Sequence, residues 1–147
     1  MLATALASVA LLPGLLTPTV AEVKQDTKLP ILLPSTLVTN ETKELFASGE
    51  GAARTYQFVL STVEDCGANA CSTAWFYGSK GGSVYGDRKA TLANGRNGRY
   101  IPLSCGGSCS PPSIVWKERG VVYEISMDAT RAQLVRMANS AIKKGPR

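Results

Sequence analysis

The four cysteines are the residues whose type and spacing point most directly to chemistry. They form two close pairs, Cys66 with Cys71 and Cys105 with Cys109, and each pair encloses small residues that favour turns. Glycine and asparagine permit the tight turn that a short ring needs, so we expect two local disulfides. Pairing between the two loops is the alternative, and it would restrict the unfolded chain more strongly. Either pairing indicates an oxidising compartment.

Zinc binding and thiol exchange are the competing uses of these thiols. Zinc-binding cysteine pairs usually enclose two residues, whereas the pairs here enclose four and three. The sequence contains no C-x-x-C motif, which disfavours thioredoxin-like exchange. We therefore expect neither a metal nor a cofactor.

Histidine-dependent catalysis is excluded for this chain, because none of its 147 residues is a histidine. Glu64 and Asp65 fall in an expected loop, and no spacing fixes two carboxylates across a cleft as a glycosidase needs. Ser79 and Lys80 lie in a Gly-rich stretch that lacks the spacing of a P-loop. We predict a non-catalytic binding protein. An enzyme inhibitor, or a His-independent hydrolase acting in the cell envelope, is the alternative.

Aromatic and basic side chains supply the candidate binding residues. Trp75, Phe76 and Tyr77 are consecutive, and successive strand residues point to opposite faces of a sheet, so at least one must face away from the core. Trp75 and Tyr77 could then stack on sugar rings or anchor a partner. Arg96 and Arg99 belong to a basic hairpin. The expected partner is an envelope protein, a glycan or an anionic polymer, and not a nucleic acid, although a net charge of +5 is also ordinary for solubility.

The N-terminal segment has the composition of a signal peptide. Residues 1–21 carry no charged side chain, and an apolar run from Leu2 to Leu12 is followed by small residues at Thr19 and Ala21 that suit a signal peptidase. The basic residue that usually precedes such a run is missing. We expect residues 22–147 to form one secreted or periplasmic domain without a membrane span.

A buried N-terminal helix is the competing interpretation of the same segment. We expect Pro13, Gly14 and Pro18 to interrupt such a helix. The residues that follow, 22–35, contain two more prolines and predict an extended arm.

Hairpins are the elements that must position the candidate residues. Alternating or β-branched segments predict strands at 54–63, 72–77, 89–93, 99–103, 113–117 and 121–125. In the last of these hairpins, Trp116 lies opposite Tyr123. A Gly-rich stretch from Gly78 is expected to end the second strand.

Helices are expected on either side of these hairpins. A short one should begin at Asn40 and end before Gly49. A C-terminal helix should run from 129 to 144, capped by Asp128 or Thr130, because its apolar residues recur at helical spacing. The predicted fold is α+β: an antiparallel sheet built from hairpins, with the C-terminal helix packed on one face and two disulfides.

The last hairpin and helix carry a resemblance. The motif I-x-W-x-x-x-G-V-x-Y-x-I, from Ile114 to Ile125, precedes a helix that contains residues 134–140, and Leu33-Pro34 lies upstream. This arrangement resembles the C-terminal part of uncharacterised bacterial exported or membrane-anchored domains. The resemblance implies a bacterial envelope setting and a sheet-plus-helix fold, and it transfers no catalytic residue.

Overall fold

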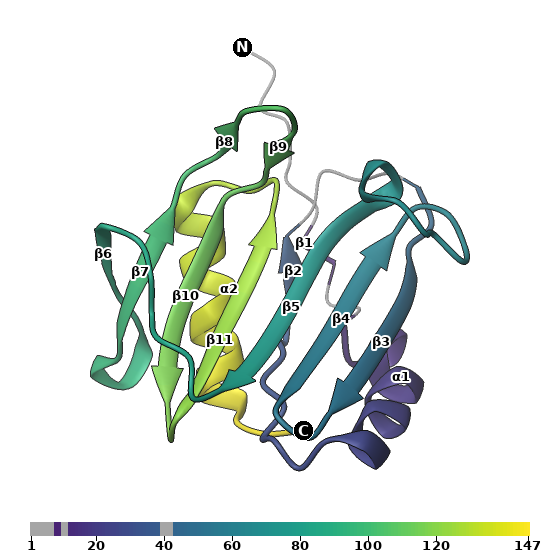
Figure 1. The fold of residues 1–147 in the computed structure, drawn as a ribbon, viewed down its shortest axis with the longest axis horizontal. Coiled ribbons are helices and arrows are strands. Elements are labelled where there is room, and N and C mark those ends of the chain that lie inside the picture. The colour runs from purple at the N-terminus through teal and green to yellow at the C-terminus, as the bar shows by residue number, and fades with distance from the viewer. Residues whose placement is uncertain (1–7, 10–11, 39–42) are drawn as a thin grey trace.

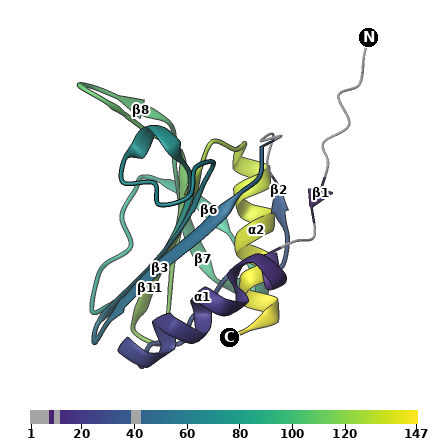
Figure 2. The ribbon, with the colours of Figure 1, turned by 90° about the vertical axis from the view of Figure 1, so that its right-hand side faces the viewer.

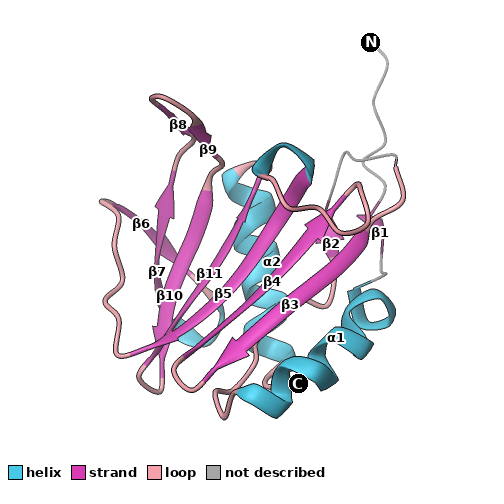
Figure 3. Ribbon diagram, turned by 45° about the vertical axis from the view of Figure 1, so that its right-hand side comes forward, coloured by secondary structure: helices cyan, strands magenta, loops and turns pink. Residues whose placement is uncertain are grey.

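A seven-stranded antiparallel sheet forms the centre of the computed structural model, which describes residues 8–9, 12–38 and 43–147 (Figure 1). The strand order is β3-β4-β5-β11-β10-β7-β6. These strands are β3 (Phe46–Ala52), β4 (Thr55–Ser61), β5 (Ser72–Lys80), β6 (Arg88–Thr91), β7 (Asn97–Ile101), β10 (Ser113–Glu118) and β11 (Val121–Met127). The two-residue strands form two small sheets beside it, β1 (Ser8–Val9) with β2 (Leu37–Val38) and β8 (Ser104–Cys105) with β9 (Cys109–Ser110) (Figure 3).

Two α-helices, α1 (Leu12–Asp26) and α2 (Arg131–Lys144), lie on the same side of the large sheet (Figure 2). We call this side the helix face, and its inward side chains include Phe58, Phe76 and Ile125, all at most 2% exposed. The opposite side is the open face. The described residues contain no helix with the length and apolar character needed to cross a bilayer.

The C-terminal helix confirms its sequence prediction. Thr130 is the N-cap: its hydroxyl accepts a hydrogen bond from the Gln133 backbone N–H, and the Gln133 side chain accepts one from the Thr130 N–H. Apolar residues of α2, among them Leu134 and Met137, are fully buried against the sheet. The sheet and the C-terminal helix together confirm the predicted α+β fold.

The three predicted hairpins are present, and both local disulfides form. Strand β4 pairs with β5, β6 with β7, and β10 with β11, where Trp116 stacks on Tyr123 with ring centroids 5.6 Å apart. Disulfides join Cys66 to Cys71 and Cys105 to Cys109, so the crossed pairing and the four-thiolate zinc site are both wrong. Strand β5 continues to Lys80 instead of breaking at Gly78.

The helix α1 contradicts the expectation that prolines interrupt the N-terminal segment. Pro13 lies in the first turn, where a backbone N–H has no partner in the helix, while Pro18 is inside the helix and exposed. The helix is held by packing, because Leu16 and Val23 are at most 2% exposed. It crosses the expected cleavage point after Ala21, and so includes the first residues of the predicted extended arm.

The short helix expected from Asn40 is also wrong where the structure describes it. Residues 46–52 form strand β3, and residues 39–42 lie outside the described part. At Gly49 a Cβ atom would come within 2.9 Å of Thr19, Val23 and Phe58 side-chain atoms. The small residues of β3 therefore allow α1 to pack directly on the sheet, and this tertiary contact outweighs the low strand propensity of glycine.

Candidate functional site

Strand β5 presents its consecutive aromatic residues to opposite faces of the sheet, as their spacing predicts. Phe76 is 1% exposed on the helix face. Trp75 and Tyr77, on either side of it, are half-buried on the open face. Their neighbours across the strands on that face are Ser126 and Val59 for Trp75, and Glu124 and Gln57 for Tyr77. Most of these neighbours are small or polar, so they leave room above the two aromatic rings.

Three irregular segments lie on the open face (Figures 1 and 2), and each contributes residues to the hollows that Trp75 and Tyr77 line. The first is the disulfide loop, residues 66–71, and the second is the disulfide hairpin, residues 104–110. The third is the strap, residues 81–87, which connects β5 to β6 across the face. Lys117 Nζ donates a hydrogen bond to the Gly82 carbonyl of the strap (3.0 Å), and Val115 beneath the strap is fully buried.

Two adjoining hollows lie between these segments, and we call them together the trough. The larger has a volume of about 540 Å³ and contains Trp75, Tyr77 and Glu124 in its lining. The smaller has a volume of about 330 Å³ and is lined in part by Glu50 and Gln57. Trp75 and Asn69 line both hollows. The indole of Trp75 therefore lies where the two hollows meet.

Tyr85 brings a third aromatic ring from the strap to the larger hollow. Its hydroxyl donates a 2.6 Å hydrogen bond to Glu124 Oε2, although the residue is 51% exposed. Burial, followed by the hydrogen bond to Glu124, raises the pKa of the Tyr85 phenol. Burial and the Glu124 charge also raise the pKa of Tyr77. Both phenols consequently stay protonated near neutral pH: the Tyr85 proton is used in the hydrogen bond to Glu124, and the Tyr77 hydroxyl can donate to a ligand.

The charge of the trough is acidic, in contrast to the net charge of +5 for the chain. Glu124 is the charged residue in the lining of the larger hollow, and Glu50 is the charged residue in that of the smaller. The remaining polar groups are mainly serine hydroxyls and the amides of Asn69 and Gln57. The aromatic rings of the trough can stack on a ligand, and its hydroxyl, amide and carboxylate groups can form hydrogen bonds with that ligand.

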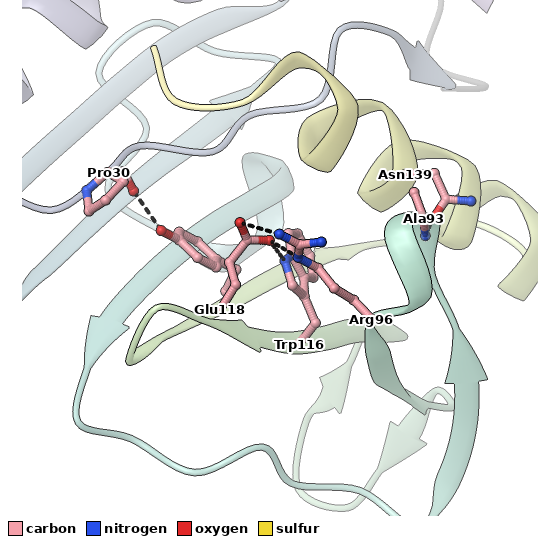
Figure 4. Close-up of polar contacts among 7 residues, drawn as sticks. Pro30, Ala93, Arg96, Trp116, Glu118 and Asn139 are labelled. Atoms are coloured by element: carbon pink, nitrogen blue, oxygen red, sulfur yellow. Dashed lines mark hydrogen bonds and ion pairs between the residues drawn. The ribbon is translucent and has the colours of Figure 1, made fainter.

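Arg96 lies on the other side of the sheet, away from Trp75 and Tyr77. Its Nε is 2.8 Å from Glu118 Oε2, and the same oxygen accepts a 3.2 Å hydrogen bond from the indole N–H of Trp116 (Figure 4). The preceding turn is tied to α2, because the Ala93 N–H donates to Asn139 Oδ1 at 2.7 Å. Arg96 thus neutralises the carboxylate of Glu118, which in turn binds the indole N–H of the buried Trp116.

Arg99 is on the open face but outside the trough. It pairs with Val115 in the strand register, and a Cβ atom at Gly86 of the strap would lie 3.3 Å from the Arg99 Cβ. The structure therefore brings Trp75 and Tyr77 together and separates them from both arginines that the sequence singled out.

Replacing Arg96 with glutamate should destabilise the fold by about 1–2 kcal/mol, because the new carboxylate would face Glu118 and remove its counter-charge. Lys89→Glu, at an exposed position of the β6 edge strand, is the control and should change stability by less than about 0.5 kcal/mol. Urea denaturation measures both. Equal stabilities of the two variants would contradict the structural role of Arg96.

The sequence did not single out Tyr85, Glu124 or Asn69 as site residues. Glu124 carried a usable signal, since it is an acidic residue between Tyr123 and Ile125, at the strand position that points away from the core. Tyr85 carried none, because its place depends on how the strap crosses the sheet. Asn69 was visible only as a turn residue within the first cysteine pair.

No protein-family model matches this chain, and no curated protein or solved structure matches it either. The resemblance of the last hairpin and helix to bacterial exported domains stays a prediction. The functional argument consequently depends on the geometry of the trough.

Proposed function

We propose that this protein is a non-catalytic, exported binding domain that holds its ligand in the trough of the open face. The observation that carries the proposal is the position of Trp75 and Tyr77, whose rings are half-buried in the lining of a hollow on the sheet face that the helices leave uncovered. Aromatic surface that meets water at a concave site is typical of binding sites.

The lining of the trough favours binding over catalysis. Among the described residues that line the larger hollow, Glu124 is the single carboxylate, whereas glycoside hydrolysis normally uses a pair at a set separation. Nucleophilic chemistry by a serine needs a neighbouring base such as histidine or lysine, and the described residues that line the trough include neither. Export is supported by the two disulfides, which persist in oxidising compartments. Residues 1–21 have the composition of a signal peptide, but residues 12–21 belong to helix α1 with Leu16 buried, so the proposal does not depend on cleavage after Ala21.

An enzyme inhibitor is the second candidate, and the disulfide hairpin favours it. Residues 104–110 are exposed throughout, their ends are joined by a disulfide, and the hairpin projects from the sheet on the side away from the helices (Figure 2). Such a stiff exposed loop suits insertion into a protease. Replacing Gly107, at its tip and outside the lining of both hollows, with tryptophan would weaken inhibition, whereas Trp75→Ala in the trough would leave inhibition unchanged.

Replacing Trp75 with alanine should weaken ligand binding by about 10- to 100-fold, because stacked aromatic side chains dominate such interfaces. The protein should be retained on at least one of three immobilised probes: a neutral polysaccharide, polyphosphate, or a reduced and alkylated protein. Val63→Ala, which shortens an apolar side chain that is 54% exposed and does not line the trough, is the control and should bind normally. Absence of retention on all three probes, or retention unaffected by Trp75→Ala, would contradict the proposal.

A further inference from the structure

We infer that the ligand of the trough is a neutral, extended glycan; this inference rests on the proposed function and names its ligand class. The first argument is local charge. The charged residues in the lining are carboxylates, Glu124 and Glu50, so an anionic polymer would meet like charge. The positive net charge of the chain does not offset this locally, because Arg96 lies on the other side of the sheet and Arg99 lies on the open face but outside the trough.

The second argument is the kind of hydrogen-bonding group that the trough offers. Its floor is the face of a sheet, where the backbone N–H and C=O groups of β5 are paired with those of β4 and β11. An extended peptide usually binds a sheet through free backbone groups at an edge strand. On this floor it would find side chains alone. Serine hydroxyls, amides and a carboxylate are suited instead to sugar hydroxyls, each of which both donates and accepts.

The third argument is the spacing of the aromatic rings. Trp75 and Tyr77 are two residues apart on one strand, which separates their Cα atoms by about 6.5 Å. That spacing is comparable with the length of one sugar residue, so the two rings can contact neighbouring residues of one chain. The smaller hollow continues beyond Trp75, which gives a longer glycan a path along the face.

Tyr85 adds a ring whose position is already fixed. Its hydrogen bond to Glu124 holds the strap against the floor of the larger hollow, so less side-chain freedom is lost when a ligand binds. Glu124 lines the same hollow, and its second carboxylate oxygen can accept a hydrogen bond from a sugar hydroxyl.

Titration calorimetry with a matched set of probes tests the ligand class. The probes are β-linked hexasaccharides of glucose, N-acetylglucosamine and mannose, a hexamer of a uronic acid, and an unstructured peptide of Gly, Ser and Thr. At least one neutral hexasaccharide should bind, with at least 10-fold weaker binding to Trp75→Ala and at least 3-fold weaker binding to Tyr77→Ala. The uronate hexamer should bind at least 10-fold more weakly than that neutral hexasaccharide. Glu124→Gln should reduce this difference in affinity, because it removes a negative charge that repels the uronate.

The outcomes separate this inference from the proposed function. Binding of the uronate or the peptide in a Trp75-dependent manner, without binding of any neutral hexasaccharide, overturns the glycan inference and leaves the trough as the binding site. Failure of every probe counts against both. Neutral hexasaccharide binding that survives Trp75→Ala also overturns the inference, provided that circular dichroism shows the variant to be folded.

Discussion

Replacing Phe76 with alanine should lower the free energy of unfolding by about 3–5 kcal/mol, since the side chain is 1% exposed and its removal leaves a cavity in the core. Phe76 lies opposite Phe58 on β4 and Ile125 on β11, both of which are fully buried or nearly so. The surrounding strands are paired on both sides of β5, so they cannot collapse into the space that the phenyl ring vacates. Urea denaturation monitored by circular dichroism measures the loss.

The neighbouring position provides the control for this prediction. Trp75→Ala removes a larger side chain one residue away, yet it should cost no more than about 1.5 kcal/mol because the indole is half-buried on the open face. The same variant should lose ligand binding. Phe76 and Trp75 variants of equal stability would mean that β5 does not divide the core from the trough as described.

Replacing Gly78 with alanine should destabilise the domain by about 2–3 kcal/mol, through overpacking rather than cavity formation. A Cβ atom at this position would lie 2.2 Å from Cε1 of Tyr56. The ring cannot move away freely, because the Tyr56 hydroxyl accepts a hydrogen bond from the Leu32 N–H (3.1 Å) and donates one to the Leu32 carbonyl (3.3 Å). Tyr56 is itself 2% exposed.

Two further variants identify the cause of the Gly78→Ala effect. At Gly107 a Cβ atom would meet no atom within 4 Å, so Gly107→Ala should leave the stability within about 0.5 kcal/mol of the parent. Combining Gly78→Ala with Tyr56→Leu should cost less than the sum of the two single changes, because the shorter side chain relieves the collision. If the two changes in unfolding free energy were strictly additive, the effect of Gly78→Ala would not arise from a collision with Tyr56.

The elements that the sequence predicted well are those in which local preference and tertiary packing agree. The β10–β11 hairpin is rich in β-branched and aromatic residues, and the alternation of Trp75, Phe76 and Tyr77 places them on the faces that the structure shows. Thr130 and the apolar spacing after it marked α2, and the glycines and asparagine within the cysteine pairs favoured the local disulfides that form.

The remaining features depend on contacts between segments far apart in the sequence. Strand β3 is rich in small residues and has little strand propensity, and it forms because β4 pairs with it on one side and α1 packs on its face. Tyr85 joins Glu124 across 39 positions, and Arg96 joins Glu118 across 22. Local sequence patterns do not predict contacts between residues so far apart in the chain. The residues that line the trough could therefore be identified only from the structure.

The chain has two tryptophans, one on each face of the sheet, and their indole N–H signals test the central claim most directly. Trp75 lines the trough, whereas the Trp116 N–H is buried and bonded to Glu118. In a ¹H–¹⁵N correlation spectrum, addition of the neutral hexasaccharide that binds in calorimetry should shift the Trp75 indole signal and leave that of Trp116 in place. An unchanged Trp75 signal at saturating ligand would contradict the trough as the binding site.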